Sequence, residues 1–566
     1  MLVKVDLHNL NLNLDSDRGL HFIRRQLSRR RRPCVAFTPM ATHPFTLREE
    51  RAVFAERGVV LGTTVEKVFW FNTAGWTLPA ATSLFSSPTF DVAELKAREA
   101  RLYACKAQLS SLPMEEWKRH TASTKVSRGA LQAVRRRVAP EMCTRAFCKL
   151  YEMLVAFPAL LRRREASNAS LIEPCSTLHL CEAPGAFVAA TNHFLQSSSS
   201  AASGAAAPWQ WIGSTLDPLC EQNDSDATLG RGAVQGRFLA QTREHWEFGA
   251  DGSGNLCDAA NAAAIVRRAR ALAPRGVDLV TADGSIPCWR SPGDQERLTA
   301  MLHYCEVAVA LASLRPGGSF VCKIFTVFEH TTACALRLLG ACFERLALCK
   351  PVASSEGNSE SYIVALGCKS LPRSLVAALL NAVGPTWPSG VALLPEALLR
   401  DEARSPCCIE QLVRCADLFA SAQSAVITRN LRLFDTATAA EGNAVGGGGG
   451  GGGAAAGACS LKSSIESELA GNRAHQLVVA QHYLHRFALR SLAPSRFIVP
   501  LPGHPAASSK PAVAAAAAEK EEDDGSQLPL SFGSKRNRAQ QQQQQQQRKR
   551  KQKQKKMKRV GQGRYS

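Results

Sequence analysis

The sequence predicts an α/β protein in which helices cover both faces of a mostly parallel sheet. Residues 177–190, TLHLCEAPGAFVAA, read as a strand, a turn containing Pro and Gly, and the start of a helix. Four further apolar runs alternate with helical segments after it, which is the pattern of strand–helix–strand units in a parallel sheet. Hydrophobic residues make up 45% and charged residues 21% of the 566-residue chain, a composition typical of a globular protein with a sizeable core.

The segments that precede this stretch are predicted to be mainly helical. Residues 91–109 and 114–120 have helical patterns, and a basic stretch that ends at Val138 follows them. Residues 141–161 are predicted to form an amphipathic helix that leads into the first strand. Apolar side chains recur in it at spacings of three and four, at Phe147, Leu150, Tyr151 and Leu154.

After the first helix, strands and helices are expected in alternation. The expected strands are residues 209–217, 277–284, 319–325 and 361–366. The expected helices are residues 262–272, 295–314, 331–346 and 409–434. A turn is expected at RPGG, residues 315–318, and the Ser/Ala-rich residues 197–207 are read as a lengthened loop. Because parallel sheets bind ligands at the carboxyl ends of their strands, residues at those ends are the first candidates for chemistry.

Composition divides the chain into five regions. Short apolar runs mixed with a basic cluster and a Pro/Ser/Thr-rich patch predict a loosely ordered N-terminal extension with some helix. A glycine run flanked by alanines predicts a flexible linker, and low-complexity segments at the C-terminus predict disorder. The expected regions are the N-terminal extension (1–90), an α/β domain (91–434), a Gly/Ala-rich linker (435–460), a helical C-terminal segment that ends in a strand-like RFIV (461–503), and a disordered Ala/Gln-rich basic tail (504–566).

The formal net charge of +21 favours a polyanionic partner, and nucleic acid is the expected one. The stretch from Ser534 to the C-terminus contains 13 Lys and Arg and no acid. This tail is read either as a localisation signal or as a source of nonspecific, salt-sensitive RNA affinity. Both readings stay open.

Several classes of protein are not indicated. The sequence contains no run of 18 or more apolar residues, so no membrane span is expected. The first residues lack the basic start, apolar centre and cleavage site of a signal peptide. The 19 cysteines include no C-x-x-C pair, so reduced thiols are expected rather than a zinc or redox site, and no metal is predicted.

Four charged residues stand where the predicted fold would bring them together: Lys149 on the helix before the first strand, Asp283 at the end of LVTADG, Lys323 within SFVCKIF, and Glu360 directly before SYIVAL. A lysine inside an apolar strand is costly to bury unless it is paired. Singly, these residues have plainer readings as surface charges, a turn residue or an edge-strand lysine. Together, two lysines and two carboxylates would balance in charge and shift one another's pKa values.

The motifs RAFCKL, CEAPGAF, TADGS, GGSFVCKIF and NSESYIV resemble the FtsJ-type ribose 2′-O-methyltransferases and their Lys-Asp-Lys-Glu tetrad. HLCEAPGAF, STLDP, HYCEV, FTVFEH and EGNSESY resemble the cap-specific mRNA enzymes of this family that form cap 2, rather than the ribosomal RNA enzymes. The resemblance spans residues 114–434 and returns weakly over 475–499. It implies a Rossmann-like S-adenosylmethionine-dependent methyltransferase fold with a mostly parallel seven-stranded sheet, together with a helical N-terminal extension.

The resemblance implies that Lys149, Asp283, Lys323 and Glu360 are the catalytic residues for methyl transfer from S-adenosylmethionine to a ribose hydroxyl. Lys323 would be the base, which requires a lowered pKa, or it would stay charged and position the 2′-oxygen. The neighbouring Lys149 and burial lower its pKa, whereas the two carboxylates raise it. The sequence leaves this balance open.

The resemblance also implies four cofactor-binding residues, Gly185, Trp209, Asp217 and Asp283. Gly185 would let the cofactor approach the turn, and Trp209 would line the cofactor cleft unless it is simply a core residue. Asp217 would accept hydrogen bonds from the cofactor ribose, although the subgroup tolerates Asn there. Asp283 would serve near the sulfonium as well as in the tetrad.

The expected function is methylation of the ribose 2′-hydroxyl of capped mRNA at the second transcribed nucleotide. The alternatives are a 2′-O-methyltransferase for another cap position or another RNA, and a non-catalytic RNA-binding paralogue, which the intact tetrad argues against. The expected partner is the capped mRNA 5′ end, with transcription or RNA-processing machinery as a further candidate and no membrane. The expected location is the nucleus, with the cytoplasm as a second compartment, and the oligomeric state is not indicated.

Overall fold

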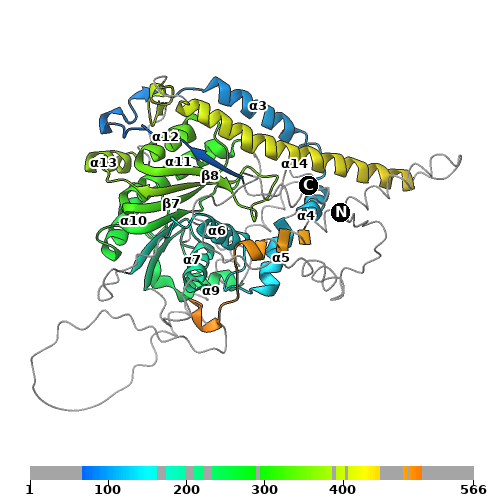
Figure 1. Cartoon of the computed structure of the whole chain (residues 1–566), viewed down its shortest axis with the longest axis horizontal. Helices are drawn as coiled ribbons and strands as arrows, with labels where there is room; N and C mark the ends of the chain where they lie inside the picture. Colours follow the sequence, from blue (N-terminus) through cyan, green and yellow to red (C-terminus); the bar gives the residue numbers. More distant parts are fainter. Residues whose placement is uncertain are drawn as a thin grey trace, which may run out of the picture. The chain divides into compact units, whose positions relative to one another are not determined.

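An eight-stranded sheet lies at the centre of the computed structural model of the chain (Figure 1). Its strands are β1 (Lys67–Phe71), β3 (Cys175–Leu180), β4 (Trp209–Ser214), β5 (Trp246–Glu247), β6 (Val277–Ala282), β7 (Leu314–Ile324), β8 (Phe343–Lys350) and β9 (Ser361–Cys368). Their order is β1-β8-β9-β7-β6-β3-β4-β5. The strands from β5 to β7 are parallel, whereas β9 is antiparallel to β7, β8 to β9 and β1 to β8. The predicted α/β fold with a mostly parallel sheet is confirmed.

Helices cover both faces of this sheet. They are α3 (Ala93–Ala107), α4 (Met114–Thr124), α5 (Ser127–Arg137), α6 (Arg145–Ala156), α7 (Ala186–Ser197), α9 (Ala233–Gln241), α10 (Ala259–Leu272), α11 (Gln295–Ser313), α12 (His330–Cys342), α13 (Arg373–Asn381) and α14 (Cys408–Val445). Figure 1 shows α10 to α13 on one face and α6 and α7 on the other. Two separate apolar cores match these two layers. None of the described helices combines the length and apolar character needed to cross a bilayer.

The structure describes residues 67–125, 127–161, 174–197, 208–220, 223, 233–288, 293–384, 390–401, 406–445, 476–477, 479–481 and 483–499. The predicted lengthened loop over 197–207 and the basic tail therefore fall almost wholly outside the described residues. A short antiparallel pair, β2 (Ser87–Pro88) with β10 (Val391–Ala392), forms a second, two-stranded sheet.

Three strands of the sheet, β1, β5 and β8, lie outside the strands expected from the sequence, and the sheet has eight strands where the resemblance implied seven. The helix predicted over 331–346 ends at Cys342, and β8 begins at the next residue. The segment FERLALCK is apolar enough for either structure, and pairing with β9 on one side and β1 on the other decides for a strand. The turn predicted at 315–318 lies within β7, with Gly317 at a φ of +78°.

The first described residues contribute to the sheet, whereas a loosely ordered extension was expected there. The segment KVFWF forms β1 and pairs with β8, with Val68 opposite Cys349. Its aromatic and β-branched residues suit a strand that is half covered. At the other end of the domain, α14 continues to Val445, past the expected helix end at residue 434, because its Ala-rich last turns favour helix. Its first half packs along α3, where Arg98 Nη2 lies 2.9 Å from Asp417 Oδ2.

The C-terminal segment packs on α6 and α7 as part of the second core. Tyr483 and Phe487 are buried there, and Asn192 Nδ2 donates to the Arg496 carbonyl. The strand-like RFIV does not join the sheet among the described residues. Instead, the amides of its last two residues donate to the half-buried Glu141 carboxylate, whose pKa burial raises to about 7.

Candidate active site

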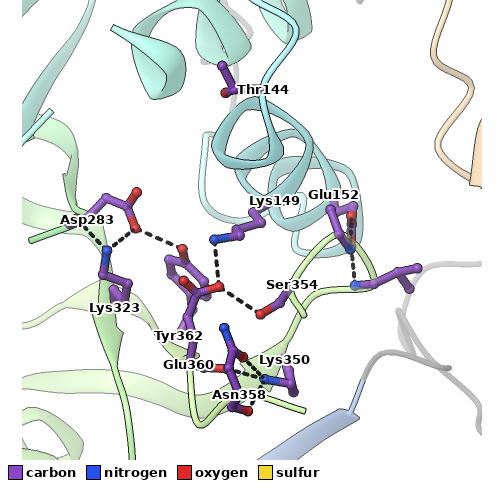
Figure 2. Close-up of polar contacts among 12 residues, drawn as sticks. Thr144, Lys149, Glu152, Asp283, Lys323, Lys350, Ser354, Asn358, Glu360 and Tyr362 are labelled. Carbon is purple, nitrogen blue, oxygen red and sulfur yellow. Dashed lines mark hydrogen bonds and ion pairs between the residues drawn. The ribbon is translucent and has the colours of Figure 1, made fainter. Parts of the chain in front are cut away.

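The four predicted catalytic residues lie together at the edge of the sheet where β3, β6 and β7 end (Figure 2). Asp283 directly follows β6, and Lys323 is next to the last residue of β7. Antiparallel β9 begins at the same edge, since Ile324 pairs with Ser361, and this places Glu360 there. Helix α6 brings Lys149 to the same place from the neighbouring layer.

Lys149 and Glu360 form a buried ion pair. Lys149 Nζ lies 2.6 Å from Glu360 Oε1, and the side chains are 11% and 12% exposed. Ser354 Oγ donates to the same carboxylate oxygen at 2.7 Å. Burial raises the pKa of the Glu360 carboxyl, but Lys149 and Lys323 outweigh burial and hold that pKa at about 2. Thr144, seen above α6 in Figure 2, caps the helix through Phe147 N and so sets where Lys149 projects.

Lys323 and Asp283 form the second pair. Lys323 Nζ lies 3.1 Å from Asp283 Oδ1 and donates to the Asp283 carbonyl at 2.7 Å. Tyr362, opposite Lys323 in the β7–β9 ladder, donates its hydroxyl to Asp283 Oδ1 at 2.8 Å. Lys149 Nζ lies 5.8 Å from the centre of the Tyr362 ring, so this tyrosine contacts both pairs.

The charge state of Lys323, which the sequence leaves open, follows from these contacts. Burial alone would lower the pKa of Lys323, but the Asp283 and Glu360 carboxylates outweigh burial and raise it above its usual value. Lys323 is therefore an ammonium at neutral pH in this site. As such it is a hydrogen-bond donor rather than a free base.

Two buried acids beneath the site were not predicted. Glu306 on α11 accepts from Gly284 N at 3.0 Å and from Cys322 Sγ at 3.5 Å, and burial raises its pKa to about 7 despite the nearby Lys323. Glu182 accepts from Phe187 N and Val188 N, which satisfies the first amides of α7. Glu306 had a sequence signal, because it is an acid directly before the apolar helix segment VAVALA, where a charged side chain is costly to bury.

Gly185 lies in the turn after β3, as predicted, but the structure gives a packing reason for it. Its φ is +116°, and a Cβ there would lie 2.3 Å from Cδ1 of Phe238 on α9. A side chain would therefore be strained and would collide with a buried ring. The glycine allows α9 to close over the turn.

Trp209 does not lie at the edge where the tetrad gathers, which corrects the expectation that it lines the cofactor cleft. It is the first residue of β4, opposite Cys175, and its indole Nε1 donates to Thr177 Oγ1 at 3.1 Å. The six-residue strand separates the two edges by about 16 Å. The strand reads WQWIGS, so the tryptophan lies at its amino end and the small residues Gly213 and Ser214 lie at its carboxyl end.

Asp217 follows β4 at the carboxyl edge, but its carboxylate already has partners. Arg243 Nη2 lies 2.5 Å from Oδ2, Arg243 Nη1 lies 3.3 Å from Oδ1, and Leu219 N donates to Oδ1 at 2.9 Å. The guanidinium also lies 4.3 Å from the Phe248 ring. A ligand would therefore meet an Asp217–Arg243 unit rather than a free carboxylate.

The loop after Lys323, residues 325–330, is organised by the buried Glu296 of α11. Its Oε2 accepts from Thr326 Oγ1 and Phe328 N, and its Oε1 accepts from Glu329 N at 2.9 Å. His303, one turn before Glu306, lies beside Phe325. Among the residues that the structure describes, no group of three metal-ligating side chains occurs.

The segment that contains the tetrad is similar to known proteins. The profile of the FtsJ-like methyltransferase family matches residues 142–368, a range that includes all four tetrad positions. The cap-specific mRNA (nucleoside-2′-O-)-methyltransferase 2 of Danio rerio is 37% identical over 361 residues, which are 63% of this chain and 46% of that protein.

Two other proteins of the same name are similar to this chain. The protein of Mus musculus is 35% identical over 361 residues, 64% of this chain and 44% of the relative. The protein of Drosophila melanogaster is 35% identical over 304 residues, 53% of this chain and 41% of the relative. The match spans less than half the length of each of these relatives.

Proposed function

We propose that the chain methylates the ribose 2′-hydroxyl of capped mRNA, at the second transcribed nucleotide. The match of residues 142–368 to the FtsJ-like methyltransferase family supports this reaction class. The observation behind this proposal is the pairing of Lys149 with Glu360 and of Lys323 with Asp283 at one sheet edge. The choice of capped mRNA and of the second nucleotide rests on the similarity to relatives that are named for this reaction.

The proposed methyl donor is S-adenosylmethionine, which when bound supplies an electrophilic methyl group on a sulfonium. The residues of the site fit such a cationic ligand, because an acid follows each of β6 and β4, the two strands that flank β3. Asp283 follows β6 with its side chain 18% exposed, and Asp217 follows β4. Asp283 keeps its Oδ2 without a described partner, whereas Asp217 would bind together with Arg243.

In this proposal the tetrad orients the hydroxyl and stabilises charge on its oxygen. The Lys323 ammonium donates a hydrogen bond to the 2′-oxygen, which holds the oxygen in line with the methyl and lowers the energy of developing negative charge. Asp283 and Tyr362 hold the Lys323 side chain in place. The new O–C bond forms as the C–S bond breaks, and the hydroxyl proton leaves to the Asp283 carboxylate or to water. Lys149, held by Glu360, supplies a second positive charge beside the acceptor.

Two segments are proposed to contact the RNA, the basic end of α5 and the loop after Lys323. Arg135, Arg136 and Arg137 form the last turn of α5 and are exposed, which suits phosphate contacts. The loop 325–330, fixed by Glu296, would border the acceptor nucleotide. Single-stranded RNA is recognised through such phosphate contacts together with the 2′-hydroxyl.

The charged state of Lys323 predicts the pH dependence of the single-turnover rate. The raised pKa keeps the ammonium through the range from about pH 6 to pH 10, and the rate should fall only when that group loses its proton in more alkaline solution. A Lys323 that acts as a base with a lowered pKa would instead give a rise of about tenfold per pH unit below that pKa. Glu306→Gln is the control, because the Glu306 carboxyl titrates near 7 and could produce a limb of its own.

The activity itself is tested with the purified chain, methyl-labelled S-adenosylmethionine and short capped RNAs, with and without a methyl group on the first nucleotide. Nuclease digestion then identifies the ribose that holds the label. Label on the second nucleotide is expected. Label on the first nucleotide or in the RNA body would keep the chemistry and change the substrate. Binding of RNA and cofactor without label on any RNA would favour the non-catalytic paralogue.

We also propose that the basic tail directs the chain to the nucleus. The 13 Lys and Arg after Gly533 suit an import signal. Deleting residues 534–566 should shift a fluorescent fusion toward the cytoplasm and leave the salt dependence of RNA binding unchanged. A tail that serves mainly RNA affinity would show the opposite, an unchanged location and a shallower salt dependence.

A further inference from the structure

The loop between β8 and β9, residues 351–360, ends in Glu360, and contacts hold it at both ends (Figure 2). We call it the β8–β9 loop. The position of the Glu360 carboxylate, and with it the partner of Lys149, depends on how this loop is held.

The first end of the loop is bound by Glu152 of α6. Its carboxylate is fully buried and accepts from Val352 N at 2.7 Å and from Ala353 N at 2.9 Å. Glu152 is three residues after Lys149, so the two side chains project from the same face of the helix. Helix α6 therefore binds the start of the loop through Glu152 and its end through Lys149.

The last residues of the loop are bound by Lys350, the final residue of β8. Its Nζ donates to the Asn358 carbonyl at 2.9 Å, to Asn358 Oδ1 at 2.8 Å and to the Glu360 carbonyl at 2.7 Å. An ammonium has three N–H donors, and all three are used here. A neutral amine has only two, so the full set of three requires the charged form, although burial and the nearby Lys67 and Lys149 lower the pKa of Lys350 to about 7.

The middle of the loop has anchors of its own. Ser127 N donates to Glu356 Oε1 at 2.9 Å, and Gln423 Nε2 donates to the Gly357 carbonyl at 3.0 Å. Ser359 Oγ accepts from Lys106 Nζ at 3.0 Å and donates to Gln423 Oε1 at 3.0 Å. Loss of Lys350 would therefore remove the anchors of Asn358 and of the Glu360 backbone without releasing the whole loop. The backbone of Glu360 would then be held by its strand alone.

We propose that Lys350 and Glu152 are positioning residues that hold the Glu360 carboxylate against Lys149. This inference rests on the proposed function for its kinetic consequence and on the contacts above for its structural one. Neither residue contacts the reacting atoms, and both act through the backbone of the β8–β9 loop. In the sequence they have no motif, because four of the five contacts given above for them are to backbone groups.

The kinetic test compares Lys350→Met with Lys369→Met in the full chain. Lys369 is the matched control, because its Nζ also donates to a backbone carbonyl, that of Ala341, at the opposite edge of the sheet. Lys350→Met should lower the single-turnover rate by roughly 10- to 100-fold, with unchanged cofactor affinity, whereas Lys369→Met should stay at the wild-type rate. Glu152→Gln keeps one acceptor oxygen and should lose less. A wild-type rate in Lys350→Met, or an equal loss in Lys369→Met, would overturn the proposal.

A second readout separates positioning from a general structural role. In a Glu360→Gln background, Lys350→Met should cause no further loss of rate, since the group that it positions is already altered. A further loss as large as in the wild-type background would mean that Lys350 acts by another route, and the proposal would fail.

Hydrogen exchange tests the same inference without any methyl transfer. Peptides that cover 352–361 should exchange faster in Lys350→Met than in Lys369→Met, with the rest of the chain unchanged. If the wild-type chain transfers no methyl group to any RNA, this result still stands or falls by itself. Unchanged protection of the loop would overturn the positioning role.

Discussion

Replacing Lys323 with alanine is expected to reduce methyl transfer by about 10²- to 10⁴-fold, the largest kinetic effect in this site. The substitution removes the proposed donor to the 2′-oxygen and also leaves Asp283 without its ion pair at 3.1 Å. Cofactor affinity should change little, since Lys323 would contact the acceptor rather than the donor. The measurement is a single-turnover rate with labelled cofactor, beside an equilibrium titration of cofactor binding.

Arg315→Ala is the matched control for this substitution. Arg315 forms an ion pair with Asp278 at 2.7 Å between the same two strands, β6 and β7, but at the amino edge of the sheet. It should affect stability without lowering the rate. Near wild-type transfer by Lys323→Ala would contradict the assignment of the tetrad.

The largest effect on stability is expected from Tyr483→Ala, far along the chain from the tetrad. Tyr483 is 1% exposed, packs against Phe487 with ring centres 4.8 Å apart, and donates to the Cys148 carbonyl at 3.1 Å. Truncating a large buried aromatic lowers the free energy of unfolding by about 3–5 kcal/mol. Activity should fall as well, because the Cys148 carbonyl directly precedes Lys149 on α6.

The free energy of unfolding of Tyr483→Ala is compared, by urea unfolding, with those of two reference variants, Tyr483→Phe and Leu477→Ala. Tyr483→Phe keeps the ring and should cost about 1 kcal/mol for the lost hydrogen bond. Leu477, 36% exposed in the same segment, should tolerate alanine with little change. A Tyr483→Ala variant as stable as Leu477→Ala would show that the C-terminal segment does not support the domain.

The sequence predicts those parts of the fold whose signals are local. The strand and turn at CEAPG, the helix of Lys149 and the strands that end in Asp283 or contain Lys323 are recognisable from runs of a few residues. Strands β8 and β1 are not recognisable in this way, because a short apolar segment suits either a helix or a strand until its neighbours are known. Pairing with β9 and with the KVFWF segment supplies the missing information.

In the candidate site, too, some features have local sequence signals and others depend on contacts between distant residues. The tetrad follows from the order of its motifs, whereas the partners of its members do not. The contact of Arg243 with Asp217 spans 26 residues, and that of Tyr362 with Asp283 spans 79. Trp209 is expected at the cofactor cleft, but it is the first residue of β4 and lies opposite Cys175 at the amino edge, which only the register reveals. The charge of Lys323 likewise depends on distances that spacing along the chain does not give.

The contact between Tyr483 and Cys148 also has a consequence for the time course of biosynthesis. The two residues are 335 positions apart, so at a translation rate of about 5–20 residues per second the nascent α6 waits roughly 20–70 s for the segment that covers it. During that interval an apolar helix face beside Lys149 is open to water and to chaperones. A ribosome that stops before residue 483 would release a chain with every tetrad residue and an incomplete second core. Active protein is therefore expected to appear only after the C-terminal segment has left the exit tunnel.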